Sequence, residues 1–287
     1  MDVVTNLTEL RHHRDADVCV LVDSEPDLAL EAASQLDLLW PLANHQVRRP
    51  SVIINEGEVD IVLMILREDR SFTPLRLLSR GRGVLAIGDI EAFEFIRPAL
   101  EASRGGNWET LVAATLAIAH AGDEVLGAID DDCQELAEEA SGYASSVERR
   151  AIGRMRADLF KIGEAQAAHQ SMVEAISEAA VIDDEKQQRL LARASRSFEA
   201  GQSTTTRLYA MLGDVLNEQD TLVSERLTLV ATIFLPLTLA TGFFGMNFDW
   251  MTDRIGGFGA FMILGIALPT ALAGGTLLLV RRLTRSK

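Results

Sequence analysis

The chain has 287 residues, of which 48% are hydrophobic and 24% charged, and its formal net charge is −15. This acidic balance disfavours a nucleic-acid-binding protein, because phosphate contacts need a basic surface, and it makes cations the more natural partners. The two cysteines, Cys19 and Cys133, lie far apart in the sequence, and no Cys or His has metal-ligand spacing, so neither a disulfide framework nor a structural zinc site is supported.

Residues 1–102 have the pattern of an α/β domain. Short runs rich in Val, Ile and Leu predict strands at residues 17–23, 50–55, 60–67 and 72–87. Leu and Ala recur at helical spacing from about Pro26 to Leu42, which predicts a helix between the first two strands. The N-terminus has no basic start followed by an apolar stretch, so we expect no cleaved secretory signal and a cytoplasmic location for this domain.

Two long acidic helices are predicted in residues 103–182. The segments Trp108–Gly142 and Ser145–Ala180 are rich in Ala, Glu, Leu and Arg and contain no proline. Their junction near Ser141 has the character of a turn.

A stalk helix is predicted for residues 183–226, with Asp183 or Asp184 as its N-cap. No proline interrupts it before it enters the apolar sequence that follows, and an unbroken helix to Gly245 would be about 90 Å long. Because a single helix of that length is not stable alone, we expect support from copies in other subunits, and hence a homo-oligomer.

Two apolar stretches near the C-terminal end predict transmembrane helices at residues 227–248 and 255–280. They contain 22 and 26 residues without a formal charge, and about 20 residues suffice to cross the hydrocarbon core. A buried helical hairpin of a soluble protein is the alternative, but two such stretches side by side make it improbable. Pro236 lies inside the first stretch, which suggests that this helix packs against neighbours.

The charges around these stretches predict the topology. The connecting loop, residues 249–254, holds two carboxylates and one arginine, whereas the tail, residues 281–287, carries four basic residues. The positive-inside rule then places both termini in the cytoplasm and the loop outside. We therefore expect a multi-pass protein of the cell membrane (inner or plasma membrane).

The first apolar stretch ends in the tripeptide Gly245, Met246, Asn247, preceded by the block ATIFLPLT at Ala231–Thr238. In this setting, with one further span after a short loop, the chain resembles the CorA family of divalent metal-ion channels. The resemblance is close from about Asp183 to Met251, whereas before it only the order of elements matches. It implies a homopentamer in which the first span lines a pore and the second faces lipid.

The residues of the first span agree with this implication. A stripe of mainly small or hydroxyl-bearing residues recurs at helical spacing through Ser224, Thr228, Ala231, Leu235, Thr238 and Gly242. Such a stripe can line water or allow close helix packing, and both alternatives place it at a symmetry axis. By resemblance, Thr238 is a polar pore position, and Leu227 and Leu235 form a constriction. Thr221 and Ser224 stand where the family often has asparagine and methionine.

The resemblance also implies how an ion would be handled. A ring of Asn247 side chains would bind hydrated Mg²⁺ through its retained waters, with Gly245 and Met246 as supports. Asp249 and Asp253 would concentrate cations at the mouth, although each is as readily an ordinary solvated loop carboxylate. In relatives, cytoplasmic carboxylates bind regulatory Mg²⁺. Acidic runs are available here, but no motif matches them and they are more commonly solvated helix faces: Asp130, Asp131, Asp132, Glu135, Glu138, Glu139, Asp183, Asp184 and Glu185.

The leading functional hypothesis is therefore a passive channel driven by the membrane potential. Mg²⁺ is the expected substrate, with Co²⁺ or Ni²⁺ as further candidates, and Mg²⁺ is also a candidate regulator. A proton-coupled zinc transporter of the same superfamily and a non-conducting, membrane-anchored sensor or scaffold remain as alternatives. We expect neither a cofactor nor an enzyme, because no nucleophile–base pair or phosphate-binding glycine loop occurs.

Overall fold

The computed structural model describes residues 2–4, 18–22, 34, 49–55, 58–80, 83–102, 107–140, 142, 144–179, 182–246 and 257–284. The chain divides into two compact units. Unit 1 comprises Met1–Ser141 and Ser145–Asp214, and unit 2 comprises Gly142–Ala144 and Val215–Lys287.

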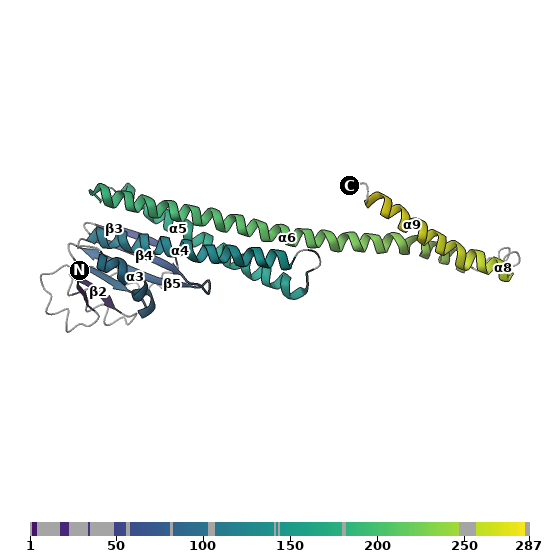
Figure 1. The fold of residues 1–287 in the computed structure, drawn as a ribbon, viewed down its shortest axis with the longest axis horizontal. Coiled ribbons are helices and arrows are strands. Elements are labelled where there is room, and N and C mark those ends of the chain that lie inside the picture. Colours follow the sequence, from purple (N-terminus) through teal and green to yellow (C-terminus); the bar gives the residue numbers. More distant parts are fainter. Residues whose placement is uncertain are drawn as a thin grey trace. The chain divides into compact units, whose positions relative to one another are not determined.

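A mixed sheet forms one layer of unit 1 (Figure 1). Its six strands lie in the order β1-β2-β6-β5-β4-β3, with the first three parallel and the remaining neighbours antiparallel. The strands are β1 (Asp2–Val4), β2 (Val18–Val22), β3 (Ser51–Asn55), β4 (Glu58–Leu66), β5 (Phe72–Arg80) and β6 (Gly83–Ile87). This sheet gives the α/β domain that the sequence predicts.

Several details of this sheet differ from the sequence-based prediction. The predicted strand at residues 72–87 is two strands, β5 and β6, and β1 was not predicted. Gly81 and Arg82 stand between the two strands in the sequence, and both belong to the turn-prone segment in which the prediction placed no boundary. The predicted helix at residues 26–42 lies outside the described residues except for Ser34, which is helical.

Among the described residues, the sheet is followed by the helices α3 (Ile90–Ala102), α4 (Asn107–Glu139), α5 (Ser146–Glu178) and α6 (Glu185–Gly245). The sequence analysis missed α3, which begins where the Asp89 carboxylate accepts a hydrogen bond from the Ala92 N–H at 2.7 Å. A capping box starts α5, since Ser145 and Glu148 satisfy each other's backbone N–H groups.

Helices α3, α4 and α5 pack on the sheet (Figure 1), and the hydrophobic core lies between the two layers. Alternate residues of β4, including Ile61 and Leu63, point into it because side chains of a strand alternate between faces. Leu111 of α4, Val173 of α5 and Phe198 of α6 complete the core from the helical layer. Burial of these apolar side chains is what holds the helices on the sheet.

Unit 2 contains the last part of α6 and three consecutive helical segments after it: α8 (Phe258–Ala260), the π-helix η1 (Phe261–Ala267) and α9 (Leu268–Thr284). Within the described residues, three helices are long and apolar enough to cross a membrane: Trp108–Glu139, Glu185–Phe243 and Phe258–Thr276. The apolar window of the first is 44% buried inside the protein, whereas those of the other two are not buried at all. The apolar residues of α4 therefore serve the core of unit 1.

Candidate functional site

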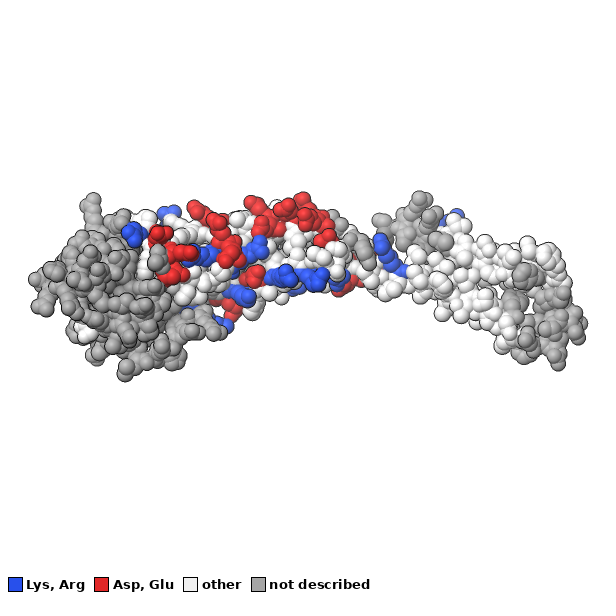
Figure 2. Space-filling view, turned by 90° about the horizontal axis from the view of Figure 1, so that it is seen from below, with Lys and Arg blue, Asp and Glu red and all other residues white. Residues whose placement is uncertain are grey.

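The C-terminal part of α6 carries the residues that the sequence singles out. It stays helical through Thr, Val and Ile, whose stiff side chains favour strands in water, and through Pro236. Proline has no N–H, so the carbonyl of Thr232 lacks its usual helical donor. Residues 227–246 and 257–280 contain no charged side chain, and the described part of the matching surface in Figure 2 is white.

All eight predicted pore-lining residues are exposed in the single chain. They are Thr221, Ser224, Leu227, Thr228, Ala231, Leu235, Thr238 and Gly242. The two leucines are among the most exposed large apolar residues, with 65% of Leu227 and 76% of Leu235 accessible. Large apolar side chains at this exposure need a further partner, which is lipid or another protein chain.

The opposite side of the same helix is partly covered within unit 2. Ile233, Pro236, Leu237 and Ala240 are partly buried, and at about 100° per residue they lie roughly opposite the predicted pore face. A second partly buried stripe runs along the segment that follows, through Ala260, Leu264, Pro269, Ala273 and Thr276. The covered side of α6 is thus the side expected to face the second span, and the predicted pore face is left open.

Every threonine hydroxyl recorded on this part of α6 donates to a backbone carbonyl one turn earlier. Thr228 donates to Ser224 at 2.8 Å, and Thr238 donates to Phe234 at 2.8 Å. Thr221 makes the same bond to Asn217 at 2.9 Å. At Thr228 and Thr238 this back-bonding satisfies the hydroxyl proton inside an apolar segment.

The predicted selectivity tripeptide lies at the end of this helix. Gly245 is the last residue of α6, and Met246 follows with 45% of its surface exposed. The Met246 N–H donates to the Phe243 carbonyl at 3.4 Å, which closes the helix end. Asn247, Asp249 and Asp253 lie outside the described residues, so their roles stay predictions.

The acidic run of α4 is partly engaged within unit 1. Asp130 accepts from Arg207 of α6 at 2.6 Å, and Asp132 accepts from Arg70 of the β4–β5 turn at 2.5 Å. The amide of Gln134, followed by Arg207, holds the pKa of Asp130 below its usual value of 3.8. Among the described residues, no group of three or more His, Cys, Asp or Glu side chains is arranged to hold a metal ion.

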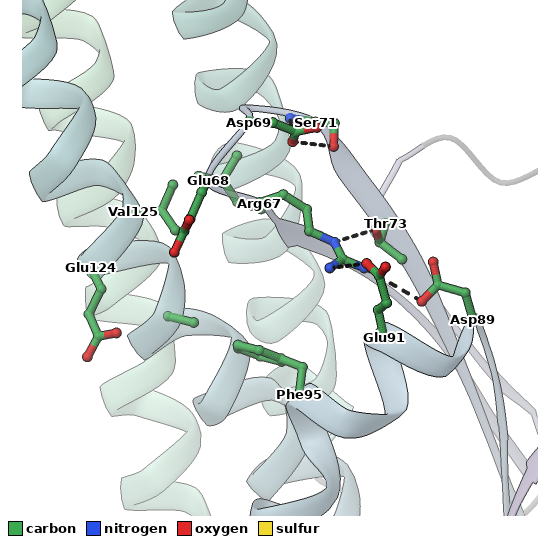
Figure 3. Close-up of a pocket in the computed structure, with 12 residues that line it drawn as sticks. Arg67, Glu68, Asp69, Ser71, Thr73, Asp89, Glu91, Phe95, Glu124 and Val125 are labelled. Carbon is green, nitrogen blue, oxygen red and sulfur yellow. Dashed lines mark hydrogen bonds and ion pairs between the residues drawn. The ribbon is translucent and has the colours of Figure 1, made fainter.

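A cleft of about 850 Å³ opens between the β4–β5 turn, α3 and α4 (Figure 3). Arg67 lies in its wall, where Nε donates to Thr73 at 2.9 Å and the guanidinium contacts Glu91 at 2.5 Å and Asp89 at 3.7 Å. In the turn, Asp69 accepts from both the N–H and the hydroxyl of Ser71, which lowers the pKa of Asp69. Sequence reasoning missed this network, because its members come from separate elements and share no motif.

The turn beside this cleft holds an arginine in a conformation that favours glycine. Arg70 has φ = 68°, the left-handed region, and its N–H donates to the Arg67 carbonyl at 2.9 Å. In this conformation the Arg70 guanidinium forms an ion pair with Asp132. The ion pair therefore ties the hairpin to α4.

Comparison with known proteins was made at the level of sequence and of fold. The model of the family described as "CorA-like Mg2+ transporter protein" matches residues 68–282. YfjQ of Bacillus subtilis (strain 168), whose name assigns it to metal ion transport, is 41% identical over 63 residues, which is 20% of this chain. This match spans about a fifth (20%) of the length of that curated relative.

Two solved structures share the fold. The complete CorA magnesium transporter from Methanocaldococcus jannaschii superposes with a TM-score of 0.65 at 16% identity, covering 92% of this chain and 90% of that one. The cytoplasmic domain of ZntB from Vibrio parahaemolyticus RIMD 2210633 superposes with a TM-score of 0.56 at 15% identity, covering 70% and 84%. At these identities the likeness is one of fold.

Proposed function

The chain belongs to the CorA-like Mg²⁺ transporter family, and from this premise we propose that it is a channel for passive flow of divalent cations across the membrane. Mg²⁺ is the proposed substrate, with Co²⁺ or Ni²⁺ as further candidates. The flow is driven by the concentration gradient and the membrane potential. No cofactor is part of this proposal.

The observation that carries the proposal is the open face of α6. Its exposed stripe combines hydroxyls with two strongly exposed leucines, and the covered residues lie on the other side of the helix. In a ring of subunits this face would surround a central axis. Thr228 and Thr238 would each form a ring of hydroxyls around it, and Leu235 would form a constriction. Hydroxyls suit a hydrated ion, whereas an apolar ring can close the pathway by excluding water.

Asn247 is the proposed selectivity residue. Mg²⁺ gives up its water reluctantly, so a ring of uncharged amide oxygens can hold the hydrated ion without trapping it. Asp249 and Asp253 would raise the cation concentration at the outer mouth. The proposed assembly is a homopentamer with two spans per subunit and both termini in the cytoplasm.

The test is divalent-ion flux into proteoliposomes that contain the purified full-length protein. We expect Mg²⁺ entry that needs no pH gradient and falls at least about tenfold in Asn247→Ala, because the ion then loses its outer-shell acceptor. Asn55→Ala, the same change on β3, is the matched control and should conduct normally. The absence of any divalent flux in the unmodified protein would refute the proposal.

A zinc transporter is the second candidate, and the fold shared with the ZntB cytoplasmic domain favours keeping it. The same proteoliposomes decide between the two. Zn²⁺ entry that depends on a pH gradient, with no Mg²⁺ entry, would replace the first candidate by this one.

A further inference from the structure

On the open face of α6, the threonine hydroxyls donate their protons to backbone carbonyls. The Oγ1 atoms of Thr221, Thr228 and Thr238 each donate to a carbonyl four residues earlier, at 2.9, 2.8 and 2.8 Å, and all three side chains are exposed. A hydroxyl has one proton and two lone pairs. Each of these oxygens therefore faces its surroundings as a hydrogen-bond acceptor.

A surface that can only accept hydrogen bonds interacts differently with hydrated cations and with hydrated anions. The waters around a cation turn their oxygens inward and their O–H groups outward, so the outer surface of the shell donates hydrogen bonds. The waters around an anion use one O–H toward the ion and expose their lone pairs and only one remaining O–H, so an acceptor surface bonds that shell less fully. A wall of hydroxyls that can only accept thus favours cations through the orientation of their water, without any buried charge.

Two threonines of the same segment provide a natural comparison. Thr232 and Thr241 make the same bonds, to Thr228 at 2.7 Å and to Leu237 at 3.0 Å, and both are exposed. At about 100° per residue, however, they lie about 80° to 100° away from the centre of the open face. Their hydroxyls have the same local chemistry but a different direction.

From this geometry we infer that Thr228 is a residue that determines the selectivity for cations over anions, and that Thr221 is a second residue with the same role. This inference rests on the proposed pore. It also explains why a threonine suits the polar pore position at Thr238. The bond from its hydroxyl to the backbone carbonyl leaves the hydroxyl oxygen able only to accept. The ligand recognised is the water shell of a divalent cation.

The experiment replaces the hydroxyl by a methyl group of similar size. Full-length Thr228→Val, Thr228→Ser and Thr232→Val proteins are reconstituted in planar bilayers under a MgCl₂ gradient, and both conductance and reversal potential are measured. Thr228→Val should lower Mg²⁺ conductance at least about fivefold, because one lost hydrogen bond alone corresponds to about that factor and every subunit of the ring loses one. It should also shift the reversal potential toward that of chloride. Thr228→Ser and Thr232→Val should match the unmodified protein.

Each other outcome has a defined meaning. Equal reversal potentials for Thr228→Val and Thr232→Val would overturn the inference while leaving the channel proposal intact. A loss in Thr228→Ser as large as that in Thr228→Val would also overturn it, because the methyl group would then be the feature that matters. If Thr228→Val does not assemble, Thr221→Val against Thr232→Val decides by the same readout. An unmodified protein that passes no ion defeats the channel proposal first.

Discussion

His169 of α5 accepts a hydrogen bond from β4 beyond the point where β3 stops pairing with it. β3 pairs with β4 as far as Val62, and two residues further along β4 the Met64 N–H donates to His169 Nε2 at 3.1 Å. The ring also stacks on Phe198 of α6, with the ring centres 4.5 Å apart. Because Nε2 accepts, the neutral ring carries its proton on Nδ1. One side chain thus joins the sheet to two helices.

This environment predicts a dependence of stability on pH. Burial lowers the pKa of His169 to about 3 from its ordinary value of 6.5. The unfolded chain therefore binds a proton below pH 6.5 that the folded chain does not bind, and the free energy of unfolding falls as the pH drops from 6.5 toward 3. The expected slope from this group is about 1.4 kcal/mol per pH unit. Thermal unfolding of the full-length protein in detergent at about pH 7 and about pH 5 measures it.

His169→Phe is the variant that isolates this contribution, because phenylalanine keeps the ring but neither titrates nor accepts from Met64. Its stability at pH 7 should be lower by about 1–3 kcal/mol, the cost of an unpaired buried N–H. The further loss between pH 7 and 5 should be smaller than in the unmodified protein. An identical acid-induced loss in both proteins would show that carboxylates, and not His169, set the pH dependence.

At the scale of elements, the helices of unit 1 contain glycines in opposite situations. A Cβ added at Gly127 of α4 would meet nothing within 4 Å, whereas one at Gly201 of α6 would lie 3.0 Å from Leu126 Cδ1 and 3.2 Å from Gln166 Cδ. Alanine is favoured over glycine in a helix by about 1 kcal/mol. The close contacts at Gly201 oppose this gain.

We expect Gly127→Ala to stabilise unit 1 by about 0.5–1 kcal/mol and Gly201→Ala to destabilise it by about 1–3 kcal/mol. The midpoints of thermal unfolding of the two variants, measured side by side, check the difference in sign. Equal midpoints would mean that α4 and α6 separate enough in solution to accommodate the extra methyl group.

The elements also differ in how far sequence could predict them. The long helices were predictable because α4 and α5 contain no proline over 33 residues each and are rich in helix-forming residues. The 13-residue α3 was not, since Pro98 stands inside it and only Gly88 separates its cap residue, Asp89, from the preceding strand. Its start signal is local, whereas its stability comes from Phe93 and Ile96 in the core.

In the candidate site too, local patterns were predictable from the sequence and contacts between distant residues were not. The stripe on α6 has a periodicity that sequence reveals, and all of its residues share one exposed face. The Arg67 network and the His169 contact join residues far apart in the chain, and His169 and Met64 are separated by 105 positions. Pairings at that distance depend on the packing of the sheet against the helices, which no local pattern encodes.

At the scale of the whole molecule, apolar composition alone does not separate core helices from membrane spans. The apolar window of α4 is nearly half buried, at 44%, whereas those of α6 and of the segment from Phe258 have no buried share. The latter two need a solvent or partner other than water. This difference supports the proposal of two spans in each subunit.

The open face of α6 predicts that the chain self-associates, and the proposed pore gives the assembly five subunits. Its strongly exposed leucines, Leu227 and Leu235, are expected to meet their counterparts in other subunits. We expect light scattering of the detergent-solubilised protein, corrected for detergent, to give a particle of five chains of 31.3 kDa each. A monomer or dimer at micromolar concentration would contradict the ring.

The π-helix of unit 2, η1, determines how the helix around it would respond to the deletion of one residue. The Leu268 N–H donates to the Ile263 carbonyl, five residues back, so η1 accommodates one residue more than an α-helix would over the same rise. The partly covered stripe takes its wider step there, from Leu264 to Pro269. Deleting a single residue from η1 would therefore restore a regular helix and leave everything beyond it on the same side, whereas deleting a residue from α9 would turn everything beyond the deletion by about 100°. The π-helix thus keeps the parts of the helix before and after it presenting the same side.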